Sequence, residues 1–383
     1  MDILYASNIN TEHSVGELSD IECSTPFRIS LDEKFDDLFD LLAIMSVNDE
    51  TSPNPYLKIK KCLGLSHYET LMTMSNVKRS EMLNEKKALI QRALEDSASQ
   101  VYLESYLQQK NFLRSLKVPN INKQLLKSIV EKIEHQHVRE RVQNFANSRD
   151  KTFYRMSGTT TGRLTVFSGP NILTLPSFVR EGIQTQFPGG KVLQIDLTAA
   201  EPHLALLLCD KTPPEDIYEH IAKHVLNNTV TRKEAKLITL SALYGQSSHN
   251  LKKVLPKSVC ARSVIGETRE YFQVDKLRRI IGKTRTEDTI RNVLGRPIRI
   301  EDDRKDLMIS YYLQSSIAEC SILMFADFCK RADKRVKPYY VIHDALIFDA
   351  DRELSNVLSE NKMLKLSMGS WKFQAKVSDL KDN

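Results

Sequence analysis

Four side chains recur at every fourth position in the stretch TRKEAKLITLSALYGQ, namely Arg232, Lys236, Leu240 and Tyr244. Successive residues of an α-helix turn by about 100°, so steps of four drift by only about 40° and the four side chains share one face over roughly three turns. The helix dipole does not stabilise cations near a helix start. We therefore expect the two cations to face a polyanion such as a triphosphate. An amphipathic surface helix with solvated cations would show the same spacing.

A carboxylate ends a short apolar run in the segment VLQIDLTAAEPHLALLL. Asp196 follows the β-branched residues, and an apolar helical pattern begins at Ala200, which predicts a strand, a turn and a helix. Glu201 falls in the first turn of that helix. It would either belong to a site or only stabilise the helix N-terminus as an acid.

A second carboxylate, Asp344, follows His343 in YYVIHDALIF, whose β-rich flanks predict a hairpin with this charged pair at its tip. A carboxylate among apolar strands is costly unless it is paired or binds a metal. Asp196 and Asp344 are the minimum set for a Mg²⁺ site that also takes phosphate oxygens. Two ions about 3.5–4 Å apart would clamp the attacking and leaving oxygens of phosphoryl transfer. Salt-bridged structural aspartates would look the same.

Together with TGRLTVFSGPN at residues 161–171, these segments resemble, in order, the motifs of family A DNA polymerases, the class of bacterial DNA polymerase I and several phage replicases. TGRL with the following Pro-Asn pair resembles the primer and template contact motif. DLTAAEPH resembles motif A, RKEAKLITLSALYG resembles motif B, and IHDA resembles motif C. The resemblance spans roughly residues 150–383 and suggests the polymerase domain of an enzyme from a phage or a bacterial mobile element.

The resemblance implies a metal site and a nucleotide site. Asp196 and Asp344 would bind two Mg²⁺ ions, with Mn²⁺ as an alternative, and the backbone carbonyl of Leu197 would add a ligand. Arg232 and Lys236 would hold the triphosphate of the incoming dNTP. Lys236 would act in catalysis with the two aspartates, because it neutralises charge as pyrophosphate leaves.

Other matched positions concern selection and DNA contacts. Glu201 matches the steric-gate glutamate that excludes a 2′-hydroxyl, and Tyr244 matches the aromatic residue that closes the base-pair pocket and pairs with that glutamate. The positions that match contacts to primer-template DNA are Arg163, Asn171, Gln314 and His343.

Several positions depart from the family pattern. Leu240 stands where phenylalanine or tyrosine is usual, so selection at the sugar 3′ position is expected to differ. Tyr218, in DIYEHIA, stands where a phosphate-contacting histidine is expected; we assign it to nucleotide binding, with His220 or His224 as substitutes for the missing imidazole.

Two further departures flank the predicted metal ligands. Ala345 replaces the acid that normally follows the motif C aspartate, which removes one carboxylate but spares both ligands. Pro202 and His203 replace Leu-Arg after the gate glutamate, so the local packing must differ.

These elements predict an α+β fold of several subdomains, arranged as a right-hand polymerase. An antiparallel-sheet palm would comprise residues 151–212 and 310–383, and helical fingers would comprise 213–309. Residues 76–150 form a thumb-like helical region, although a plain helical hairpin fits them equally well. Residues 1–75 have no assigned role, and the absence of a DxE pattern in a strand context predicts no 3′–5′ exonuclease.

Composition agrees with this interpretation. A net charge of +6 over 383 residues indicates a mild preference for anionic partners, here primer-template DNA and dNTPs, with a helper protein as a further, unidentified partner. Six cysteines without CxxC spacing predict a reduced protein without a zinc site. No apolar stretch reaches membrane-spanning length, and the acidic N-terminus does not resemble a targeting peptide. We expect a location in the cytoplasm of a bacterium or of a phage-infected cell.

Two other functions share part of this pattern. A single-subunit RNA polymerase or a primase would have the two aspartates, the lysine and the Tyr-Gly pair, but phage-type RNA polymerases have a small residue at the position of Glu201. Primer synthesis with a partner protein stays open. A DNA-binding module without catalysis would not need a pair of carboxylates suited to metal binding.

Overall fold

The computed structural model describes residues 97–245, 248–286, 289–300 and 305–380, together with residues 44, 75 and 77. The prediction for residues 1–75 lies almost entirely outside the described residues, and so does most of the segment 76–96. The chain divides into two compact units.

The smaller unit comprises residues 1–108, 155–157 and 293–297. Its described part includes residues 97–108 of helix α6 (Ser97–Ser115). Arg296 is buried; its guanidinium donates to the hydroxyl of Tyr102 at 3.2 Å and to the carbonyl of Met156 at 3.0 Å. One buried cation thus ties together three segments of this unit.

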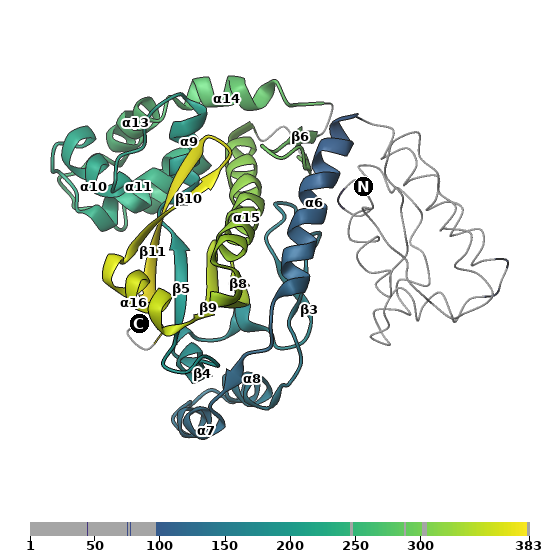
Figure 1. Cartoon of the computed structure of the whole chain (residues 1–383). Coiled ribbons are helices and arrows are strands. Elements are labelled where there is room, and N and C mark those ends of the chain that lie inside the picture. The colour runs from purple at the N-terminus through teal and green to yellow at the C-terminus, as the bar shows by residue number, and fades with distance from the viewer. Residues whose placement is uncertain are drawn as a thin grey trace. The chain divides into compact units, whose positions relative to one another are not determined.

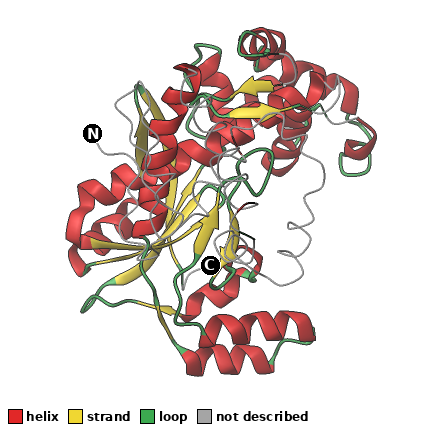
Figure 2. Ribbon diagram, turned by 90° about the vertical axis from the view of Figure 1, so that its right-hand side faces the viewer, coloured by secondary structure: helices red, strands yellow, loops and turns green. Residues whose placement is uncertain are grey.

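The larger unit contains a five-stranded antiparallel sheet with the strand order β10-β11-β5-β9-β8, which confirms the predicted antiparallel sheet. The strands are, in that order, Met363–Met368, Trp371–Asp379, Lys191–Leu197, Ala345–Ala350 and Val336–Ile342. Every residue of β9 is buried, including Asp349, because both faces of this inner strand are covered. Figure 2 shows the strands gathered into one sheet with helices packed against it.

Long helices cover this sheet. Helix α15 (Lys305–Ala332) contacts both edge strands, β8 and β10 (Figure 1). Helix α16 (Arg352–Asn361) packs against β11 and β5. None of the described helices combines the length and apolarity needed to cross a membrane.

The other face of the sheet is covered in part by a helical hairpin, α7 (Lys123–Glu131) and α8 (Gln136–Asn147). Leu126 and Phe145 of this hairpin share a core with Val192 of β5, Tyr340 of β8 and Ile347 of β9. The short segments nearby are β1 (Asn120–Ile121) paired with β4 (Ile183–Gln184), β2 (Phe153–Arg155) paired with β3 (Thr165–Ser168), and the 3₁₀ turns η1 (Ile172–Thr174) and η2 (Ser177–Gly182).

Helices dominate the middle of the chain. They are α9 (Ala200–Leu208), α10 (Ile217–His220) with the π-helical turn η3 (Ile221–Val225), α11 (Arg232–Tyr244), α12 (Ser248–Leu251), α13 (Ala261–Tyr271) and α14 (Val274–Gly282), followed by the paired strands β6 (Thr289–Arg291) and β7 (Pro297–Arg299). Helix α11 starts with a capping box between Thr231 and Glu234 and ends at Gly245, whose φ is +67°. It packs against α13 through its buried face, which leaves the predicted stripe exposed or half-buried.

Candidate active site

The two predicted carboxylates lie at the ends of neighbouring strands. Asp196 is the penultimate residue of β5 and pairs with Ala345, the first residue of β9. Asp344 lies in the turn just before β9, and its carbonyl accepts a hydrogen bond from the backbone N–H of Leu197 at 3.1 Å. Since neighbouring strands are about 4.8 Å apart, the two carboxylates lie close together at the same end of strands β5 and β9. The hairpin predicted around Asp344, and the strand, turn and helix predicted around Asp196, are both present.

The two carboxylates disfavour each other's ionisation. Burial, together with the nearby charge of Asp344, raises the pKa of Asp196 to about 6. Burial likewise raises the pKa of Asp344. A hard divalent cation such as Mg²⁺ would neutralise this excess negative charge, so the donor set fits the predicted ion. No third His, Cys, Asp or Glu joins such a cluster among the described residues, so further ligands would have to be backbone carbonyls, water or phosphate oxygens.

A polar chain runs from Asp196 along β5. Gln194 lies two residues earlier on the same face of the strand, and its Nε2 donates to Asp196 Oδ2 at 3.3 Å. Arg180, from η2, donates from Nη1 to Gln194 Oε1 at 3.2 Å. The amide is therefore held at both ends, and it orients one oxygen of the Asp196 carboxylate.

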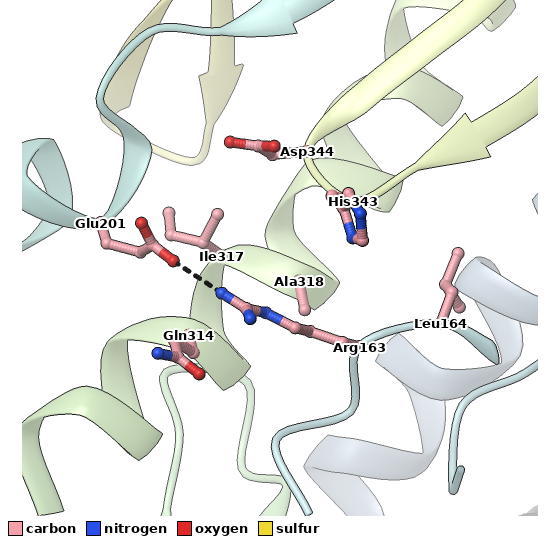
Figure 3. A pocket seen from close by; sticks show the side chains of 8 residues that line it. All are labelled: Arg163, Leu164, Glu201, Gln314, Ile317, Ala318, His343 and Asp344. Carbon is pink, nitrogen blue, oxygen red and sulfur yellow. Dashed lines mark hydrogen bonds and ion pairs between the residues drawn. The ribbon is translucent and has the colours of Figure 1, made fainter. Parts of the chain in front are cut away.

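A pocket of about 270 Å³ opens beside Asp344 (Figure 3). Gln314 and two apolar neighbours reach it from α15, and His343 reaches it from the β8–β9 turn with a φ of +55°, in the left-handed region. Arg163 and Glu201 approach each other across the pocket and form an ion pair of 3.2 Å. The residues that line it are Arg163, Leu164, Glu201, Gln314, Ile317, Ala318, His343 and Asp344.

Glu201 connects this pocket to the end of α11. Burial raises the pKa of its carboxyl group, and the charge of Arg163 opposes that shift. Tyr244, the last residue of α11, interacts with both Glu201 and Gln314. Burial and the Glu201 carboxylate raise the pKa of the Tyr244 hydroxyl, which therefore stays protonated as a hydrogen-bond donor.

The other end of α11 carries the cations. The guanidinium of Arg232 lies 5.6 Å from the ring centre of Tyr218, and Lys236 Nζ lies 5.9 Å from the same centre. Arg232 Nε also donates to Asp216 Oδ2 at 2.7 Å, and Asp216 is the N-cap of α10. Lys236 lies within electrostatic range of both carboxylates at the strand ends.

Some predicted residues lie away from this cluster. Asn171 is an exposed residue at the start of η1 and is not among those that line the pocket. Leu240 is half-buried in the third turn of α11. His220 and His224 stack on each other with ring centres 4.9 Å apart, and His220 lies 5.5 Å from the ring of Tyr271 in α13. The two histidines therefore pack toward α13.

No protein-family model and no curated protein matches the sequence. Among solved structures, the chain is similar to the POL domain of Pol1 from M. smegmatis, solved in complex with a DNA primer-template and dNTP. The TM-score is 0.54 at 16% sequence identity, and the match covers 88% of this chain and 80% of that one. The chain has the fold of a DNA polymerase domain.

Within this polymerase fold, several polar residues around the carboxylates escaped the sequence analysis. Gln194 and Arg180 have already been described, and Asp216 pairs with a predicted cation. Lys376 of β11 is the cross-strand partner of Asp196. The only signal in the sequence for such residues is a polar side chain at every second position of an apolar strand. That signal shows which face of the strand the side chain lies on, but not which residues of other strands lie beside it.

Proposed function

We propose that the chain is a template-directed DNA polymerase that adds dNTPs to a primer 3′ end and belongs with the family A enzymes. The observation that carries the proposal is the pair of carboxylates, Asp196 and Asp344, at the ends of neighbouring strands and within electrostatic range of Lys236 of α11. The polymerase fold supports it. In this proposal the palm comprises residues 151–212 and 310–383, the fingers 213–309, and the thumb-like region 76–150.

The reaction joins the primer 3′ oxygen to the α-phosphorus of the dNTP and breaks the bond from that phosphorus to pyrophosphate, while the hydroxyl proton passes to solvent. Two Mg²⁺ ions held by Asp196, Asp344 and the Leu197 carbonyl would lower the pKa of the primer hydroxyl and stabilise charge on the leaving group. Gln194 keeps the Asp196 carboxylate oriented for this task.

The triphosphate binds along the exposed face of α11. Lys236 neutralises charge on the departing pyrophosphate, and Arg232, held by Asp216, binds the outer phosphates. Tyr218 supports both cations with its ring. Because it is a neutral phenol in place of an imidazole, it contributes a hydrogen bond and no charge.

Sugar and base selection occurs at the other end of the helix. Glu201, half-buried and held by Arg163, occupies the space that a 2′-hydroxyl would need. Tyr244 closes the base-pair pocket against it, and Leu240 lies one turn earlier near the sugar 3′ position. This arrangement favours dNTPs and argues against an RNA polymerase.

The primer end occupies the pocket beside Asp344. His343 and Gln314 line it, and Arg163 contacts the minor groove of the primer terminus. The 3.2 Å ion pair of Arg163 with Glu201 must loosen for this contact, so primer binding and gate position are coupled. Asn171 contacts DNA outside this pocket.

Primer extension tests the proposal. Purified protein with Mg²⁺ is given a primed or an unprimed template, with either dNTPs or rNTPs. Products from dNTPs on the primed template alone are the expected result. Products from rNTPs on bare template would identify a primase, and no product under any condition would leave a DNA-binding module. The lack of a 3′–5′ exonuclease stays a prediction, which the stability of a labelled primer without dNTPs would check.

A further inference from the structure

The β10–β11 hairpin forms a ribbon that begins beside Asp196 and carries lysines on one face. Lys376 lies directly across from Asp196, and directly opposed residues on neighbouring strands have Cβ atoms about 4.5–5.5 Å apart. Lys365 and Lys372 share the same face at alternating positions, and all three lysines are exposed. We call these three residues the lysine strip.

No acidic residue balances the strip on its own ribbon face. Besides the lysines, that face carries only neutral residues, which are Met363, Ser367, Gln374 and Ser378. Within the described part of the chain, none of the three lysines forms an ion pair with a carboxylate. The three lysines lie at diagonal or alternate positions of one face, so their charges add to a positive field that attracts an anion.

Two simpler explanations account for only part of the strip. Lysines on edge strands prevent unwanted pairing with other chains, and this suits Lys365 on the edge strand β10. Lys376, however, lies on β11 where that strand pairs with both β10 and β5, so it protects no edge. Lys376 makes no contact within 4 Å with Asp196, although its charge favours the ionised form of that carboxyl group and lowers its pKa.

The position of the ribbon indicates which anion it meets. In Figure 1 the ribbon rises beside α9 and α11, on the side of β5 opposite to β9 and β8. His203 of α9 holds the ribbon from the face opposite to the lysines, because its Nε2 bonds the backbone carbonyl of Lys372 at 2.9 Å and its ring centre lies 5.0 Å from that of the buried Phe373. Helix α9 also packs against α11, which carries Lys236. The primer-side pocket instead lies at the β8–β9 turn.

We propose that the lysine strip binds the triphosphate tail of the incoming nucleotide and the pyrophosphate that leaves, with Lys376 as the first contact and Lys365 and Lys372 as an exit path. This rests on the proposed function and deepens it, since it adds a cation from the sheet to Lys236 of α11, and both cations lie within electrostatic range of Asp196. Pyrophosphate carries enough charge to bridge two such ammonium groups, and the outer lysines guide it to solvent by charge alone.

The test measures binding of inorganic pyrophosphate, in buffer with Mg²⁺, by calorimetry. Lys376→Gln should weaken the affinity about tenfold, the loss of one charge-assisted contact. Lys365→Gln should weaken it less and Lys372→Gln least, while Lys376→Arg should largely retain it. In primer extension, added pyrophosphate should inhibit Lys376→Gln correspondingly less than the unaltered protein.

Lys334→Gln, which removes an equally exposed lysine in the turn before β8, serves as the matched control and should leave pyrophosphate binding unchanged. Equal pyrophosphate affinity in Lys376→Gln and the unaltered protein would overturn the proposal. A second result would also overturn it: Lys376→Gln loses affinity only for primer-template DNA, measured by fluorescence anisotropy, and the salt dependence of that DNA affinity falls by about one in slope. The strip would then bind a DNA backbone. If pyrophosphate binding depends on Lys376 but the unaltered protein extends no primer, the proposed role of the lysine strip stands and the assignment as a polymerase is refuted.

Discussion

Asp196 carries its charge at a cost to the folded chain, because burial and Asp344 both favour the protonated carboxyl group. The folded-state pKa of about 6 exceeds the unfolded value of 3.8. The group therefore contributes its full share to stability below the unfolded pKa, and that share is lost as the pH rises through 6. A site of this kind exchanges stability for function, and the exchange can be measured.

Replacing Asp196 by Asn should stabilise the protein when no divalent cation is present. The expected gain in the free energy of unfolding is on the order of 2 kcal/mol at pH 7.5, since one pKa unit corresponds to about 1.4 kcal/mol. The gain should shrink as the pH falls from 6 toward 4. Urea unfolding in EDTA at several pH values measures it, and equal stability of the two proteins at pH 7.5 would contradict the electrostatic account.

Glu201→Ala should relax the choice of sugar. Removal of the half-buried side chain opens space for a 2′-hydroxyl, so the preference for dNTP over rNTP, as a ratio of kcat/KM values, should fall at least about tenfold. Glu201→Gln keeps the volume but loses the ion pair with Arg163, so it should keep most of the preference. If the two variants discriminate equally, charge and not volume controls the gate.

Among the elements, α11 matters most to the proposed site, because this one helix would join the cations that bind the triphosphate to the residues that select the sugar. Its start is defined by the capping box, in which Thr231 Oγ1 accepts from the Glu234 amide at 3.3 Å and Glu234 Oε2 accepts from the Thr231 amide at 2.7 Å. Glu234 in the first turn also interacts favourably with the helix dipole, whereas the cations Arg232 and Lys236 do not. The cap therefore holds in place a turn that carries Arg232.

Thr231→Ala should cost about 1 kcal/mol in the free energy of unfolding, the usual value for a lost N-cap. Exchange of the Glu234 amide hydrogen should accelerate, because that amide loses its acceptor. Thr231→Ser keeps the hydroxyl and should behave nearly as the unaltered protein does. Hydrogen exchange read by NMR measures both, and an unchanged Glu234 amide in the alanine variant would refute this role for the cap.

The sequence predicted whether a segment is a helix or a strand where the spacing of apolar and charged residues within that segment determines it. The four-residue spacing of Arg232 to Tyr244 predicted α11 and its exposed face, and the apolar runs around Asp196 and Asp344 predicted strands. Register between distant strands did not follow, because it depends on packing against the rest of the sheet. Lys376 opposite Asp196 is a product of that register.

At the scale of the larger unit, the α7–α8 hairpin and the sheet share one core. Leu126 is completely buried in it and lies against Gly182, whose position leaves no room for a Cβ atom. The hairpin and the strands should consequently unfold together, although the sequence divides them between a thumb-like region and a palm.

Leu126→Ala should therefore destabilise the whole unit by about 2–5 kcal/mol, as is usual for a buried leucine. Its exposed neighbour Lys127 can be replaced by Ala at a cost within about 0.5 kcal/mol. Hydrogen exchange of amides in α8 and β8 should accelerate to the same extent in the leucine variant. Faster exchange in α8 alone would show that the hairpin opens independently.

At this scale, the sequence did not predict most contacts between residues that are far apart in the chain. The family resemblance implied that Tyr244 pairs with Glu201, and the structure has this contact, but the resemblance did not connect Arg163 with Glu201, which form an ion pair. Such a contact joins residues far apart in the chain, and no periodic pattern encodes it. Gln194 and Arg180 escaped notice for the same reason.

Single-turnover addition of one dNTP to a primed template tests the central claim most directly. The unaltered protein with Mg²⁺ should extend the primer by one nucleotide, whereas Asp196→Ala and Asp344→Ala should give no measurable product. Anisotropy should show primer-template binding by both variants close to that of the unaltered protein. Extension by either variant at a rate near that of the unaltered protein would contradict the assignment of these two carboxylates as the catalytic centre.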